Sequence, residues 1–219
     1  MFNLDVFTKD ADIGKKLLIG SLLVLTGFGI IAILGWMMEI IRKVQRGEEP
    51  ALPEFDDIGM FFMDGLKLMA VGVVWSLPVA ILVVLLTTVG IGSASFFNNA
   101  DDAAMLLVII NLCVVGLVFA YLIPVFVLFV PAAGLLAENG DLKEALDPRN
   151  AIAIFRTNPG GFLLAMLLGA AVNSVMGSIG AILCLVGIYP AMVVSYALQG
   201  QFYGNAYRNA KKNKTNMEI

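Results

Sequence analysis

Four stretches of the chain contain no Asp, Glu, Lys or Arg and consist mostly of apolar residues. They have 22, 33, 35 and 51 residues and cover 17–38, 68–100, 103–137 and 157–207. A helix needs about 20 apolar residues to cross the hydrocarbon core of a bilayer, where charged side chains are costly. The second and third stretches therefore predict one long spanning helix each. The fourth is long enough for two spans, separated near Gly187.

The first stretch has basic residues on both sides, yet it is too short for two full spans. One alternative is a single span, which leaves three lysines of the N-terminal segment outside the cell. The other is a short, broken hairpin over 17–41 that turns at Gly27-Phe28-Gly29 and returns as a helix through Trp36 to Arg46. We favour the hairpin, because it keeps all 14 basic residues on the cytoplasmic side, where retained basic loops are expected.

The basic residues also set the expected topology. The linker 92–102 contains none and is predicted to lie outside the cell, whereas both termini are predicted to be cytoplasmic. Residues 1–16 are typical of an interfacial amphipathic helix, and 208–219 of a basic cytoplasmic tail. We therefore expect a single integral membrane domain over 1–219, which crosses the cell membrane several times.

The composition supports a lipid environment and limits the chemistry. Hydrophobic residues make up 59% of the chain and charged residues 14%, against roughly 25% charged in soluble domains. Histidine is absent, and Cys113 and Cys184 lie in apolar stretches without a metal-binding spacing. The 14 basic and 17 acidic residues provide no positive field for nucleic acid. We expect the lipid bilayer as a partner, and we expect neither nucleic acid nor a metal nor a cofactor.

The acidic residues near a predicted interfacial helix, Asp56, Asp57 and Asp64, are the main candidates for chemistry. Such charges more often hold a helix at the head-group level, with Asp56 or Asp57 as its N-cap. Asp64 and Lys67 lie three residues apart on one helix face, which favours a local ion pair. The sequence contains no phosphate-binding glycine loop. We therefore expect no enzymatic activity, and an enzyme that acts on lipids through these aspartates is the weakest alternative.

Prolines interrupt the predicted spans at Pro78, Pro124, Pro131 and Pro190. Discontinuous helices form binding sites in some transporters, so a small transporter or channel is the main alternative function. Proline kinks are also common in ordinary membrane helices, because neighbouring groups satisfy the freed carbonyls. The spans carry no central charge of the kind that ion-coupled carriers usually need.

Small or compact polar residues recur every four positions in the fourth stretch, at Ala165, Gly169, Asn173, Gly177 and Ala181. Small residues let helix backbones approach closely in lipid, where apolar contact alone provides little driving force. The spacing predicts a helix-packing seam, in which the amide of Asn173 bonds across to a neighbouring helix.

The run G-W-M-M-E-I-I-R-K-V-Q-R-G at 35–47 precedes A-L-P-E-F-D-D-I-G-M-F-F-M-D-G-L at 51–66. This order resembles the domain-of-unknown-function 4013 (DUF4013) family of prokaryotic membrane proteins, in which a Gly-aromatic helix with a basic end leads into an LPE(W/F)DD…GL segment. The matching residues are Leu52, Pro53, Glu54, Phe55, Asp56, Asp57, Gly65 and Leu66. The segment 197–208 is similar to the family's closing helix. The resemblance implies a membrane protein with several spans and assigns no activity or catalytic residue.

These patterns predict an all-α polytopic membrane protein of about six helical segments. The segments are the short N-terminal broken hairpin and four full spans, accompanied by interfacial amphipathic helices. The function that the sequence favours is a non-enzymatic scaffold or accessory subunit, which packs against other membrane proteins or against itself.

Overall fold

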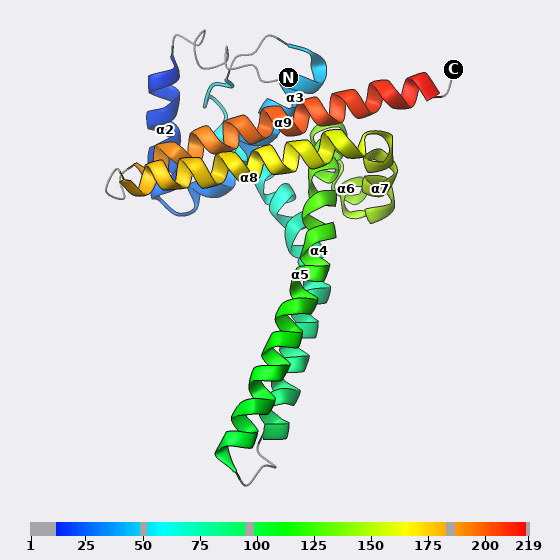
Figure 1. The fold of residues 1–219 in the computed structure, drawn as a ribbon. Coiled ribbons are helices and arrows are strands. Elements are labelled where there is room, and N and C mark those ends of the chain that lie inside the picture. Colours follow the sequence, from blue (N-terminus) through cyan, green and yellow to red (C-terminus); the bar gives the residue numbers. More distant parts are fainter. Residues whose placement is uncertain (1–11, 49–51, 95–98, 183–186, 218–219) are drawn as a thin grey trace. The chain divides into compact units, whose positions relative to one another are not determined.

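A computed structural model of the chain describes residues 12–48, 52–94, 99–182 and 187–217. These residues form helices and contain no strand, which confirms the all-α prediction (Figure 1). The helices are α2 (Ile13–Leu25), α3 (Gly29–Arg46), α4 (Ile58–Ala94), α5 (Ala100–Asn139), α6 (Leu142–Leu146), α7 (Pro148–Thr157), α8 (Pro159–Ile182) and α9 (Ile188–Met217). Most of the interfacial helix predicted over 1–16 lies outside the described residues. The predicted basic tail begins as a continuation of α9.

The chain separates into two compact units, which we call the core unit and the hairpin unit. The core unit comprises Met1–Val71 and Val127–Ile219, and the hairpin unit comprises Gly72–Phe126. The core unit therefore contains the start of α4, the end of α5 and the other described helices. The hairpin unit contains the remaining parts of α4 and α5, joined by the linker that precedes Ala100.

Three of the described helices are long and apolar enough to cross a membrane. They are Ile58–Ser93 in α4, Ala104–Asn139 in α5, and Pro159–Ile182, which is α8. Helix α9, which the sequence pattern counts as a fourth full span, does not meet these requirements. The apolar first turns of α9 lead to Gln199 and Gln201, whose side chains are buried in the core unit. The described residues thus support three spanning helices where four were predicted.

The predicted break in the first apolar stretch is confirmed. Helix α2 ends at Leu25 and α3 begins at Gly29, and Gly27 between them adopts a positive φ of 76°. A left-handed backbone of this kind favours glycine, which has no Cβ to collide with the chain. The hydroxyl of Thr26 accepts a hydrogen bond of 3.1 Å from the Gly29 N–H and so closes the turn. The stretch is therefore two helices and not a single continuous span.

Helix α9 is the centre of the core unit, because α2, α3, α7 and α8 all pack against it. Figure 1 shows α8 and α9 running side by side. On another face, Gly200 and Gly204 allow α3 to approach closely. A Cβ atom at Gly200 would lie 3.0 Å from Cγ2 of Ile40, and one at Gly204 would lie 2.8 Å from Cβ of Val44. Larger residues at these two positions would push α3 away from α9.

A second close approach joins α3 to the first turns of α4. A Cβ atom at Gly35 would collide with the carbonyl oxygen of Phe61, and one at Gly65 would collide with that of Ile31. The two backbones therefore touch directly at this crossing, with one glycine supplied by each helix. Direct backbone contact of this kind is how small residues bring membrane helices together. Gly65 of the sequence motif thus has a packing role.

The predicted seam on α8 faces α9 only in its first part. Ala165 and Gly169 are buried, and the amide oxygen of Asn173 accepts a hydrogen bond of 2.5 Å from the Ser195 hydroxyl. Gly177 and Ala181 are exposed instead. Each four-residue step turns about 40° beyond a full rotation, because an α-helix has about 3.6 residues per turn. The ridge therefore rotates away from α9.

Gly180 contacts α9 at the part of α8 where the predicted seam places Gly177 and Ala181. It is buried, and a Cβ atom there would lie 2.8 Å from Cα of Ile188 at the start of α9. By contrast, a Cβ atom at Gly177 would meet nothing within 4 Å. The contact face of α8 thus follows a period closer to 3.6 residues than to four.

We expect Gly169→Leu to lower the free energy of unfolding by about 1–3 kcal/mol, the usual range for overpacking a filled site. A Cβ atom at Gly169 would lie 3.3 Å from Cγ of Gln199, so a larger side chain must displace the buried Gln199 side chain of α9. Gly177→Leu, on the same helix and in open space, is the matched control. Thermal melts in detergent compare the two variants, and equal melting temperatures would contradict this contact between α8 and α9.

Candidate functional site

The segment that precedes α4 is fixed to α2 and α3 by hydrogen bonds to its backbone. Leu52 and Pro53 are buried. The ammonium group of Lys16 donates a hydrogen bond of 2.7 Å to the Leu52 carbonyl. The indole N–H of Trp36 donates one of 2.9 Å to the Pro53 carbonyl. The Leu-Pro part of the LPEFDD motif therefore holds a loop against the N-terminal helix pair.

The second half of the motif combines an aromatic stack with a helix cap. The Phe55 ring stacks on Trp36 with the ring centroids 5.3 Å apart and meets Phe61 edge-on at 6.1 Å. A carboxylate oxygen of Asp57 accepts a hydrogen bond of 2.9 Å from the Met60 N–H, so Asp57 is the N-cap of α4. Glu54 and Asp56 are exposed. The geometry thus gives most of the motif a positioning role at the start of α4.

A charged cluster links α3, α4 and the end of α5 within the core unit. Nη1 of Arg42 lies 2.6 Å from a carboxylate oxygen of Asp64 and 3.1 Å from one of Glu39. Its Nε donates a hydrogen bond of 3.0 Å to the Ala137 carbonyl. Lys67 lies 3.6 Å from the other oxygen of Asp64, which is the local pair that the sequence spacing favours.

The pKa of Arg42 reflects two opposing effects. Burial alone lowers it, but the hydrogen bonds and negative charges of Asp64 and Glu39 outweigh burial and raise it above the ordinary value. Arg42 is therefore a permanent cation with two carboxylate partners, and Asp64 is held in place by Arg42 and Lys67. The cluster carries balanced charge and joins three helices.

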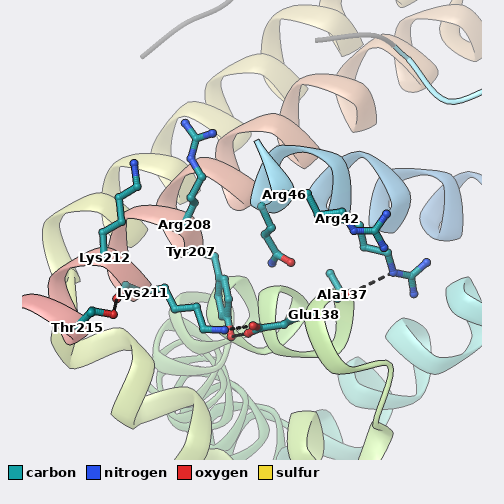
Figure 2. Close-up of a pocket in the computed structure, with 10 residues that line it drawn as sticks. Arg42, Arg46, Ala137, Glu138, Tyr207, Arg208, Lys211, Lys212 and Thr215 are labelled. Carbon is teal, nitrogen blue, oxygen red and sulfur yellow. Dashed lines mark hydrogen bonds and ion pairs between the residues drawn. The ribbon is translucent and has the colours of Figure 1, made fainter. Parts of the chain in front are cut away.

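A pocket of about 340 Å³ opens beside this cluster, and we call it the basic pocket (Figure 2). It lies between the ends of α3 and α5 and the second half of α9. Five of its lining residues are basic and one is acidic. The lining residues are Arg42, Gln45, Arg46, Ala137, Glu138, Tyr207, Arg208, Lys211, Lys212 and Thr215. No sequence pattern predicts this pocket, because its residues come from three separate helices, although 208–219 is recognisable as a basic segment.

The one acidic residue of the basic pocket is already occupied by two partners. Glu138 accepts a hydrogen bond of 2.6 Å from the Tyr207 hydroxyl and forms an ion pair with Lys211, as Figure 2 shows. Burial, together with the charge of Glu144, raises the pKa of Tyr207 to about 12. The phenol therefore stays protonated at neutral pH and remains a hydrogen-bond donor. The negative charge of Glu138 is therefore balanced by Lys211 of the same chain.

Arg208 and Lys212 retain unused hydrogen-bonding capacity. Arg208 donates hydrogen bonds of 3.3 Å to the Val44 carbonyl and to the amide oxygen of Asn205, but its buried Nε has no partner in the described part of the chain. Lys212 is exposed and forms no ion pair with any described residue. These two cations are therefore available to a ligand.

The residues named as candidates for other chemistry are not brought together. Among the described residues, no three or more His, Cys, Asp or Glu side chains lie close enough together to hold a metal ion. Cys113 is exposed on α5, and Cys184 lies outside the described residues. Asp56 is exposed, while Asp57 caps α4 and Asp64 pairs with Arg42.

We expect Asp64→Asn to lower the free energy of unfolding by about 2 kcal/mol, which is typical of losing a charge-assisted hydrogen bond. The change leaves the half-buried Arg42 with Glu39 as its one carboxylate partner among the described residues. Asp56→Asn removes the same charge at an exposed position and is expected to have little effect. Denaturation of both variants in detergent, followed by circular dichroism, measures the difference. An unchanged stability of Asp64→Asn would show that the cluster does not stabilise the fold.

Residues 18–185 match the family described as "Protein of unknown function (DUF4013)". No curated protein and no solved structure matches the chain. The match includes α3, the LPEFDD motif, α4, α5 and α8. The helical fold and the apolar spans agree with a membrane protein. The chain belongs to the DUF4013 family.

Proposed function

We propose that the protein is a non-enzymatic scaffold or accessory subunit of the cell membrane, which assembles through the α4–α5 hairpin. The partner that we propose first is a second copy of the same chain. The family match and the three apolar helices establish the class, a membrane protein. The role as a scaffold is inferred from the hairpin unit and from the acidic side chains of the core unit.

The hairpin unit has the dimensions of a membrane-spanning helix pair. Its α4 arm runs from Gly72 to Ala94, or about 34 Å at 1.5 Å per residue, slightly more than the roughly 30 Å hydrocarbon core of a bilayer. Large apolar side chains such as Val84, Leu112 and Phe119 are exposed along both arms. Asp101 and Asp102 begin the α5 arm, where they mark one membrane surface.

One amide side chain in the described part of the hairpin has no hydrogen-bond partner. The hydroxyls of Ser76, Thr87 and Thr88 all bond to carbonyls of their own helix. Asn111, by contrast, is exposed on α5 and makes no side-chain hydrogen bond with any described residue. It lies nine residues beyond Asp102, or about 14 Å along the helix, which is near the centre of the hydrocarbon core. This amide is the observation that carries the proposal.

A second copy of α5 supplies the matching chemistry. An asparagine side chain both donates and accepts hydrogen bonds, so two such amides at one depth can pair across a twofold axis. Lipid offers no alternative partner, and pairs of this type contribute about 0.6–2 kcal/mol in membranes. The helix faces around Asn111 are apolar and exposed, so they allow close contact along their length. The basic residues support the proposed topology, with a hairpin tip outside and both termini cytoplasmic.

The state of the acidic side chains supports a non-enzymatic role. Asp64 is engaged by Arg42 and Lys67, Glu138 by Tyr207 and Lys211, and Asp57 by the start of α4. A carboxylate held in this way is poorly placed to exchange a proton with a substrate. These groups are better suited to holding helices in register.

We expect Asn111→Leu to weaken self-association by roughly 3- to 30-fold, the equivalent of 0.6–2 kcal/mol. Thr88→Leu removes a hydroxyl that its own helix satisfies, so it serves as the control and should leave association unchanged. Energy transfer between labelled copies in liposomes, at several protein-to-lipid ratios, measures the effect. A monomeric wild-type chain, or equal association of Asn111→Leu, would contradict assembly through this amide.

The topology gives a separate prediction. In a chain without Cys113 and Cys184, a cysteine at Asn99 should react with a membrane-impermeant reagent added outside intact cells. A cysteine at Asn213 should react only after the membrane is opened. Asn99 lies in the predicted exterior linker 92–102, and Asn213 lies near the basic C-terminal end of α9. The opposite labelling pattern would reverse the proposed orientation.

A further inference from the structure

We propose that the basic pocket binds a phosphate group, held by Arg208 and Lys212 of α9 with Arg46 of α3. The inference is independent of the scaffold role, because it rests on the core unit and not on the hairpin. The chemical class of ligand is a phosphate ester or free phosphate.

The charge balance of the pocket is the first argument. Five basic residues line it, and the one acidic residue among the lining residues, Glu138, is paired with Lys211. Arg42 is paired outside the pocket with Asp64 and Glu39. Arg208 and Lys212 have no carboxylate partner among the residues that the structure describes. The pocket therefore retains at least two positive charges that no described group of the chain compensates.

The placement of these two residues is the second argument. Arg208 and Lys212 are four residues apart on α9, so they occupy adjacent turns of one face, and Figure 2 shows both side chains projecting to the same side of the helix. Like charges at this spacing destabilise a helix slightly, because their side chains are neighbours. An anion between them converts this repulsion into attraction. Lys211, one residue earlier, extends instead toward Glu138.

The unused donor of Arg208 is the third argument. Its Nη1 and Nη2 atoms bond to the protein, but the buried Nε has no partner in the described chain. A buried donor without an acceptor is costly, and such groups in native structures require an explanation. Arginine matches the oxygens of a phosphate group through several N–H donors, and lysine adds a point charge. Because Nε is buried, a phosphate oxygen would reach this donor only when the Arg208 side chain turns toward the pocket.

Arg46 supplies a third cation from the facing helix. Its guanidinium lies 3.4 Å from Glu48, but both side chains are well exposed, at 61% and 43%. Exposed ion pairs contribute at most about 1 kcal/mol, so Arg46 can exchange Glu48 for a ligand at little cost. The pocket thus draws its cations from α3 and α9, and its volume of about 340 Å³ accommodates a phosphate group with part of its ester.

The chemistry fits two sources of phosphate. One is the head group of an anionic phospholipid, since basic pockets at the ends of membrane helices are typical sites for such lipids. The other is a free phosphate or a water-soluble phosphate ester. Both ligands present phosphate oxygens to Arg208 and Lys212. They differ because only the phospholipid has acyl chains that are anchored in the bilayer.

Calorimetric titration of the full-length chain in neutral detergent micelles tests the proposal. One arm adds inorganic phosphate, and the other adds short-chain phosphatidylglycerol, with phosphatidylcholine as its head-group control. We expect the dissociation constant to rise roughly fivefold in Lys212→Gln, the effect of one exposed charge pair. Lys214→Gln is the matched control, because Lys214 is an exposed lysine on the same helix that does not line the pocket. Its affinity should equal that of the wild type.

Arg208→Lys provides a second variant that keeps the charge and removes the Nε donor. We expect Arg208→Lys to weaken phosphate binding as well. If the ligand were held only by non-specific attraction to positive charge, Arg208→Lys would bind it as tightly as the wild type. Binding of phosphatidylglycerol alone supports a lipid head group, and binding of inorganic phosphate as well supports a site for the phosphate group itself. The proposal is overturned if neither ligand binds, or if Lys212→Gln and Lys214→Gln weaken binding equally.

Discussion

The core unit depends on the close approach of α3 to α9, which Gly200 and Gly204 make possible. A side chain at either position would run into Ile40 or Val44, so the distance between these helices is set by the absence of two Cβ atoms. Because α2, α7 and α8 also pack on α9, displacement of α3 would disturb the unit as a whole. Close packing of this kind adds many van der Waals contacts along both helices, which together stabilise the unit.

The same approach places the charged groups. With α3 held against α9, and against α4 through Gly35 and Gly65, Arg42 reaches Asp64. At the same end of α3, Arg208 bonds to the Val44 carbonyl one turn beyond Gly204. Apolar packing therefore determines which polar groups meet, and the ion pairs then fix the relative position of the helix ends.

Features that depend on local sequence could be predicted. The all-α fold, the break at Gly27 and the capping of α4 by an aspartate each follow from a few adjacent residues. Features that depend on the tertiary structure could not. Arg42 and Asp64 are 22 residues apart and Tyr207 and Glu138 are 69 apart, so no spacing rule connects them. The α8 seam illustrates both cases, since its small residues were recognised but a four-residue repeat does not follow a helix face with a period of 3.6.

The two units satisfy the hydrogen bonds of their polar side chains in different ways. We infer that the side chains left without a hydrogen bond are the places where other molecules bind. In the hairpin, Ser and Thr hydroxyls bond to their own helix, which needs no tertiary structure. In the core unit, buried polar groups bond between helices, as Ser195 does with Asn173. Among the described residues, Asn111 of the hairpin and two buried nitrogens of the core unit, Nε of Arg208 and Nε2 of Gln201, follow neither pattern. Local rules that fail in an otherwise consistent structure often do so at functional sites. In the proposed membrane arrangement, the amide of Asn111 faces lipid, which offers no hydrogen bonds, whereas the guanidinium of Arg208 lines a pocket of positive charge. We therefore propose partners of different chemistry, a helix in lipid for Asn111 and an anion for Arg208.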